Sequence, residues 1–190
     1  MRNSIEDKKI AEVLAEFLVN QKFEDLPKET IEKAKLSIID LIGCVVGASR
    51  EPQAKILIDV MEAEGGNPQS SVFAQGFKTS VGNAALINST LGHIFDFDDD
   101  HREGTMHPSV AVFPAVFALG EKQKASGKEL MRAYILGLEV ALRIGESFLG
   151  KSYYQGFHPT GTCGIFGAAA GCALVLGLDV KRTTYAGSAS

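Results

Sequence analysis

The stretch His93-Ile-Phe-Asp-Phe-Asp-Asp-Asp-His-Arg-Glu-Gly-Thr-Met-His-Pro-Ser109 separates two helical patterns and holds most of the ionisable chemistry of the chain. Its aspartates are Asp96, Asp98, Asp99 and Asp100. Crowded carboxylates raise one another's pKa, so such a run is solvated, paired with cations or used for proton or metal chemistry. Pro108 biases His107 away from helical backbone angles. We therefore expect His107 on a turn that faces a cleft.

A second segment, Gly156-Phe-His-Pro-Thr-Gly-Thr-Cys-Gly164, has the same character. His158 precedes a proline, and a run of small residues then opens an apolar helix. The free N–H groups of a helix start bind carboxylate or phosphate. The predicted substrate-binding residues are Thr160, Gly161, Thr162 and Cys163. Close helix packing explains the same small residues and stays open as an alternative.

Asp96 is a candidate proton donor or acceptor, and a solvated helix end is the alternative for the acidic run. Carboxylates near a helix C-terminus oppose the helix dipole, at a cost of about 0.3–1 kcal/mol each. Several carboxylates at one helix end therefore favour a functional role that compensates this cost. A magnesium site at Asp96–Asp100 is a further alternative, because carboxylate oxygens suit Mg²⁺, although the spacing differs from that of a calcium-binding loop.

The sequence on both sides of this stretch predicts helices almost throughout, and hence an all-α, multi-helix bundle-like fold. The predicted helices span residues 5–21, 27–47, 52–63, 81–95, 109–124, 129–148 and 160–177, with another after Asp179. Residues 71–74 are a candidate extended piece. We expect the second helix to be buried more deeply than the first, with Ile39 and Val46 widening its inner face.

The composition limits the classes of protein to which the chain can belong. The 190 residues are 45 % hydrophobic and 22 % charged with a net charge of −4, which gives no basis for binding nucleic acid or an anionic membrane. Three cysteines without zinc spacing or a disulfide framework favour a reducing, cytoplasmic location. The polar N-terminus does not resemble a signal peptide. Five glycines within residues 160–178 indicate a packed helix rather than a membrane span.

Several motifs, in this order, resemble the MmgE/PrpD family, which includes 2-methylcitrate dehydratase and cis-aconitate decarboxylase. The motifs are Ala34-Lys-x-x-Ile-Ile-Asp-x-Ile-Gly-Cys44, His93-x-x-Asp-Phe-Asp-Asp99, His107-Pro-Ser-x-Ala-Val-x-Pro-Ala115, Ser126-Gly-Lys-Glu-Leu130, Gly137-x-Glu-Val-Ala-x-Arg143 and Phe157-His-Pro-Thr-Gly-Thr-Cys-Gly164. Each motif is weak alone, but the series covers almost the whole chain.

The resemblance implies a large helical domain followed by a smaller α+β domain, usually in a homodimer. Residues 1–190 are then the N-terminal portion of the helical domain, truncated before the α+β domain. The implied chemistry is proton transfer next to a carboxylate, with loss of water or CO₂ or epimerisation, and without metal or organic cofactor. The implied catalytic residues are Asp96, His107 and His158, the substrate is a small polycarboxylate, and the setting is propionate metabolism.

Members of that family are more than twice this length, so the resemblance predicts a lyase site that is incomplete in this chain. A different class of function also fits the sequence. The apolar last thirty residues need cover on every side, which suits a non-catalytic helical fragment that serves as a folding or dimerisation unit. That alternative predicts that Asp96, His107 and His158 lie apart, whereas the lyase predicts that they converge.

Overall fold

A computed structural model describes residues 9–148 and 150–188. Within these residues it contains nine α-helices and one two-stranded sheet, which confirms the predicted all-α class. The elements are α1 (Ile10–Asn20), the 3-10 helix η1 (Phe23–Asp25), α2 (Lys28–Ala48), α3 (Pro52–Glu64), β1 (Ser70–Ser71), β2 (Lys78–Thr79), α4 (Val81–His93), α5 (Pro108–Gln123), α6 (Gly127–Ser147), α7 (Lys151–Tyr154), α8 (Pro159–Val175) and α9 (Val180–Ser188). In the described part of the chain, no helix has the length and apolar character required to cross a bilayer.

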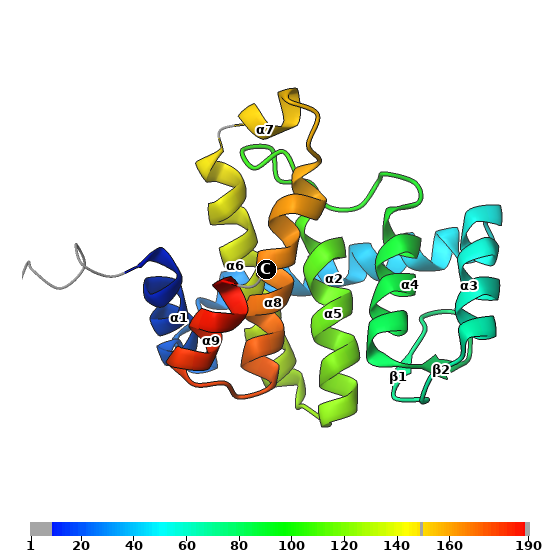
Figure 1. Ribbon diagram of the computed structural model, residues 1–190, viewed down its shortest axis with the longest axis horizontal. Helices are drawn as coiled ribbons and strands as arrows, with labels where there is room; N and C mark the ends of the chain where they lie inside the picture. The colour runs from blue at the N-terminus through cyan, green and yellow to red at the C-terminus, as the bar shows by residue number, and fades with distance from the viewer. Residues whose placement is uncertain (1–8, 149, 189–190) are drawn as a thin grey trace, which may run out of the picture.

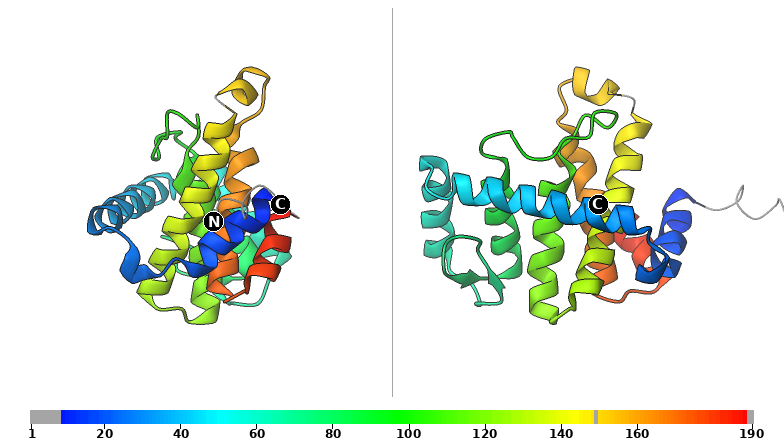
Figure 2. Two further views of the ribbon diagram at one scale, coloured as in Figure 1. Left: turned by 90° about the vertical axis from the view of Figure 1, so that its left-hand side faces the viewer. Right: turned by 180° about the vertical axis from the view of Figure 1, so that it is seen from behind.

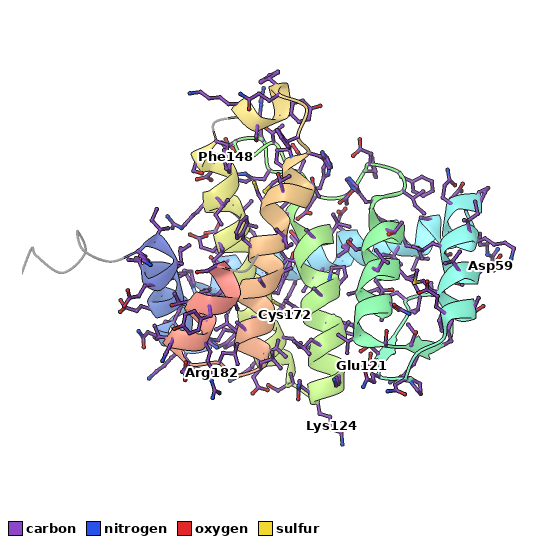
Figure 3. The ribbon with its side chains drawn as sticks, viewed as in Figure 1. Asp59, Glu121, Lys124, Phe148, Cys172 and Arg182 are labelled. Atoms are coloured by element: carbon purple, nitrogen blue, oxygen red, sulfur yellow. The ribbon has the colours of Figure 1, made fainter. Side chains whose placement is uncertain are left out.

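Helices α4, α5, α8 and α6 stand side by side, and α2 crosses behind them (Figure 1). The reverse view in Figure 2 shows α2 running across this layer, with α3 at one edge and α1 and α9 at the other. Figure 3 labels Glu121 and Lys124 at one end of α5 and Phe148 near the opposite end of the layer. At that opposite end α4 finishes and α5 and α8 begin, so the two histidine-containing segments of the sequence lie at the same place.

Glycines allow α6 and α8 to approach each other closely. A Cβ added at Gly137 would lie 2.7 Å from the carbonyl oxygen of Gly167, and one added at Gly167 would lie 2.6 Å from that of Gly137. A carbon atom cannot approach an oxygen so closely, so the two backbones meet only because both positions lack a side chain. This contact fixes where the start of α8 stands relative to its neighbours.

The helix ends follow from local sequence. Ser126 and Glu129 form a reciprocal capping box at the start of α6 (2.7 and 3.3 Å). Helices α3, α5 and α8 begin with proline at their first position. Helix α4 ends two residues before the predicted boundary, because Asp96 adopts the left-handed region (φ 51°). The segment between the predicted helices 129–148 and 160–177 contains the short helix α7.

The expectation for the inner face of the second helix was wrong at two positions, because Ile39 and Val46 are 66 % and 53 % exposed. Helix α2 contacts the layer on one side only, through buried Leu41 and Val45. Of the predicted extended piece at residues 71–74, Ser71 lies in strand β1, which pairs with β2 so that Ser70 is opposite Thr79. Residues 73–74 instead belong to the turn between the two strands, where Ala74 adopts the left-handed region (φ 58°). Of the predicted first helix, residues 5–8 lie outside the described residues.

We predict that Gly167→Ala destabilises the protein by about 1–3 kcal/mol, because the methyl group would have to separate α6 from α8. Urea unfolding followed by circular dichroism measures the change. The matched control is Gly82→Ala in the first turn of α4, where an added Cβ meets nothing within 4 Å. The control should change the unfolding free energy by less than about 0.5 kcal/mol. Equal effects of the two substitutions would contradict the close contact.

Candidate active site

Three imidazoles meet where α4 ends and α5 and α8 begin. His93 is the last residue of α4, and His107 and His158 are the N-cap residues of α5 and α8. The ring centroid of His93 lies 4.9 Å from that of His107 and 5.7 Å from that of His158, with the latter pair stacked. The structure thus brings the two predicted histidines into one cluster, with His93 between them.

The His-Pro dipeptides position two of these rings. Each proline occupies the first helical position, and each preceding histidine takes an extended backbone (φ −100° and −95°). The two helix starts are also joined directly, since the backbone N–H of His107 donates to Oγ1 of Thr160 (3.0 Å). The hydroxyl of Thr160 therefore links the start of α8 to the start of α5.

Asp96 faces the cluster from the solvent side. Its Oδ1 atom lies 3.4 Å from Nε2 of His107 and 3.8 Å from Nε2 of His93, while its side chain is 75 % exposed. The left-handed conformation at Asp96, which aspartate tolerates better than most residues, turns the chain here. The predicted trio of Asp96, His107 and His158 is therefore gathered around the ring of His93.

Asp98 lies on the opposite, buried side of the same rings. Its carboxylate is fully buried, and Oδ1 lies 2.8 Å from Nδ1 of His93. Its backbone carbonyl lies 3.1 Å from Nδ1 of His107. Its second carboxylate oxygen, Oδ2, has no hydrogen-bond partner among the described residues. Such a buried oxygen is costly, and the contacts of Asp98 with His93 and His107 are the interactions that offset this cost.

Asp99 anchors the acidic loop to the helical layer. It accepts hydrogen bonds from the backbone N–H (3.2 Å) and the hydroxyl of Ser109, in the first turn of α5. The same hydroxyl contacts the phenol of Tyr134 on α6. Burial raises the pKa of Asp99, against the opposing effect of hydrogen bonds from Ser109 and Ser37. Burial also raises the pKa of Tyr134, which keeps the phenol neutral.

The hydrogen bonds settle which nitrogen of His107 carries the hydrogen. A backbone carbonyl only accepts, so Nδ1 of His107 must donate to Asp98, which leaves Nε2 as the basic atom. Nε2 in turn faces the Asp96 carboxylate, which also only accepts when ionised. A proton placed between His107 and Asp96 removes this conflict. The pair is thus suited to hold a proton and to transfer it to a ligand.

The described residues contain one group of side chains with the proximity needed for a metal ion. Ligand atoms of His93, Asp98 and His107 lie within 4.8 Å of one another. Two atoms bound to one tetrahedral zinc ion are about 3.3 Å apart, whereas Nδ1 of His93 and Oδ1 of Asp98 are at a hydrogen-bonding 2.8 Å. The geometry favours hydrogen bonding. Within the described residues, the predicted acidic run does not gather three carboxylates of its own.

A hollow of about 470 Å³ adjoins the cluster, which is within the size range of small-ligand sites. Its polar lining residues are Gln53, Ser89, Thr90, His93, Thr160 and Gly161. The predicted amide cradle at the start of α8 is partly occupied, because the N–H groups of Gly161 and Thr162 both donate to the carbonyl of His158. The N–H of Thr160 has no partner among the described residues.

Cys163 is buried beneath this turn, and burial raises the pKa of its thiol. A thiol in that state is a poor nucleophile, so its place is in the packing of α8. His101 lies outside the cluster. Its backbone pairs with that of Met106, which is fully buried, and its Nδ1 accepts from the N–H of Gly104 (3.0 Å). Residues 101–106 therefore form a closed hairpin.

The fold and the site together define a helical domain with a cluster of histidines and carboxylates at one end. Residues 12–190 match the family described as MmgE/PrpD N-terminal domain. The chain belongs to the MmgE/PrpD family, as the sequence motifs predicted.

Curated relatives agree with this assignment. The chain is 31% identical to cis-aconitate decarboxylase of Aspergillus terreus over 155 residues, covering 78% of this chain and 31% of the relative. It is 30% identical to cis-aconitate decarboxylase of Homo sapiens over 181 residues, covering 92% and 37%. It is 28% identical to a cis-aconitate decarboxylase-like protein of Aspergillus oryzae over 184 residues, covering 91% and 38%. The chain thus spans about a third of the length of these relatives.

Sequence reasoning gave His93 no role and named Asp98 only within the magnesium alternative at Asp96–Asp100. The separation of five residues along the chain gives no contact by itself, because their pairing depends on the left-handed turn at Asp96 between them. The sequence patterns also gave Ser109 and Tyr134 no role in the site. Asp99 contacts Ser109, and Ser109 contacts Tyr134. These contacts depend on the direction of the Asp99 side chain, which is set by tertiary packing.

We predict that Asp99→Asn makes the protein less sensitive to rising pH. The folded-state pKa of Asp99 is raised, so its contribution to stability is complete below its ordinary value of 3.8 and is lost as the pH rises through the raised value. Urea unfolding at a series of pH values from 3.5 upward should show the variant losing less stability than the wild type. Asp100→Asn, at an exposed position in the same loop, is the control and should follow the wild-type curve. Parallel curves for all three proteins would contradict the assignment.

Proposed function

We propose that this protein is a lyase of small polycarboxylic acids, which removes or delivers a proton at a carbon next to a carboxylate. The observation that carries the proposal is the convergence of Asp96, His107 and His158 on one cluster. The family and the names of the relatives support lyase chemistry on a carboxylic acid. The candidate reactions are decarboxylation of cis-aconitate and dehydration of 2-methylcitrate, the latter within propionate metabolism, and epimerisation is a third outcome.

In this proposal His107 and Asp96 handle the proton. Nε2 of His107 removes the proton in a dehydration or returns one to the carbanion left by loss of CO₂, and Asp96 supplies or stores it at 3.4 Å. The carbonyl of Asp98 holds His107 in the required tautomer. General acid–base catalysis of this kind contributes about 10²–10⁴-fold to the rate.

His158 is exposed and stacks on His93, so it can reach a bound ligand. We propose that it polarises or binds a substrate carboxylate, together with the α8 turn from Thr160 to Cys163. Within that turn the N–H of Thr160 is the group that supports this role best, because the other amides of the turn are engaged. The chemistry needs no organic cofactor, because every step is a proton transfer or the loss of a neutral fragment.

The other candidate functions receive less support. A non-catalytic folding unit gives no reason for a buried, half-satisfied carboxylate against two imidazoles. A magnesium site at Asp96–Asp100 needs several oxygens directed to one point, whereas Asp98 and Asp99 are directed to different partners.

We further propose that residues 1–190 are the N-terminal portion of the family's helical domain and that the protein forms a homodimer in the cytoplasm. The outward apolar face of α2, with Leu36, Ile39 and Val46 exposed, supports association. The three cysteines are all free thiols, as in a reducing compartment. Light scattering on the purified chain tests the dimer.

We predict that His107→Asn abolishes turnover, because the basic nitrogen that faces Asp96 is removed. The assay incubates the chain with cis-aconitate or 2-methylcitrate and identifies products by proton NMR, with and without EDTA. Itaconate indicates decarboxylation, and 2-methyl-cis-aconitate indicates dehydration. His101→Asn, in the hairpin outside the cluster, is the matched control and should retain turnover. If the wild type gives no product and neither acid raises its melting temperature, the function proposed for this chain is wrong.

A further inference from the structure

The hollow beside the cluster contains little positive charge. Neither lysine nor arginine contributes to its lining, and His93 is the ionisable residue among the side chains that line it. A polycarboxylate needs hydrogen-bond donors, and those with positive charge are the strongest. Gln53 and Thr90 also offer neutral donors to the hollow, and His93 is the lining residue that can offer a positively charged one.

The contacts of His93 fit that requirement. Nδ1 is bound to the buried carboxylate of Asp98 at 2.8 Å, so Nε2 is the atom left for a ligand. A protonated imidazole donates from both nitrogens, so a bond to Asp98 and a bond to a ligand can coexist. The ionisable groups that face this ring are Asp96, Asp98, His107 and His158.

We infer that His93 binds a carboxylate group of the substrate through Nε2, and that Asp98 is the positioning residue that holds His93 for this role. The inference rests on the proposed function, because it takes the ligand to be a polycarboxylate. His93 then joins Asp96, His107 and His158 in the site, and the residues of the site have two different roles. His107 and Asp96 transfer the proton, while His93, with the neighbouring N–H of Thr160, holds the anion in the hollow.

The unpartnered oxygen of Asp98 supports this assignment. A buried carboxylate is stable only beside a compensating positive charge or enough donors, and Oδ2 has no donor among the described residues. In this inference His93 is protonated when the anion is bound, and the imidazolium then supplies the compensating charge. The bond to Asp98 fixes the ring of His93 beside the hollow, where a long side chain such as lysine would be more mobile.

Isothermal titration calorimetry with tricarballylate tests the inference. This acid carries three carboxylates on a saturated chain and lacks the reacting double bond of cis-aconitate. His93→Asn keeps an N–H that can donate to Asp98 but removes Nε2, so it should weaken binding about tenfold or more. His93→Gln, which returns a neutral donor near the Nε2 position, should recover part of the loss. Asp98→Asn should weaken binding less than His93→Asn, while His101→Asn and Asp100→Asn stay within about twofold of the wild type.

The outcomes separate this inference from the proposed function. Turnover with unchanged tricarballylate affinity in His93→Asn would leave the function and overturn the role of His93. Binding that requires His93, without turnover of either substrate, would support the anion site and remove the lyase. No binding by the wild type would overturn both. Binding that needs added Zn²⁺ and is abolished by EDTA would show a bridging metal instead, and would also overturn the direct contact. Circular dichroism of each variant confirms that it is folded.

Discussion

The hydrogen bonds between Asp99, Ser109 and Tyr134 are the constraint on which the site depends. They fasten the acidic loop to the start of α5 and to the middle of α6. With this residue held, the chain on its N-terminal side must place Asp98 beneath the imidazoles and Asp96 above them. Breaking the anchor would release both carboxylates at once, although neither takes part in it.

The acidic run therefore acts as a set of separate side chains rather than as a patch of charge. One carboxylate caps a helix, one is buried against two histidines, and one is exposed beside their Nε2 atoms. The repulsion expected from their order in the sequence is reduced because the carboxylates have different partners, with Asp98 against His93, Asp99 against Ser109 and Asp96 exposed beside His107.

Most of the helical layout could be predicted from apolar spacing, proline and glycine, because these signals are local. The predicted convergence of His107 and His158 agrees with the structure, since both precede a proline at a helix start. The role of His93 could not be predicted, because its contacts depend on how three helix ends meet. The exposed face of α2 was mispredicted because apolar spacing shows that a face is apolar but not what covers it. Ile39 and Val46 illustrate this limit.

The hairpin of residues 101–106 presents both exposed and buried positions beside the site. Its ends are held by the pairing of His101 with Met106 and by the burial of Met106. The tip between them, residues 102–105, bears no group of the imidazole cluster. Within the tip, Arg102 and Glu103 are exposed, whereas Gly104 is buried and its backbone lies against Gly145 of α6. Replacements at Arg102 and Glu103 can therefore change the charge of the surface beside the site while the buried contact of Gly104 keeps the hairpin in place.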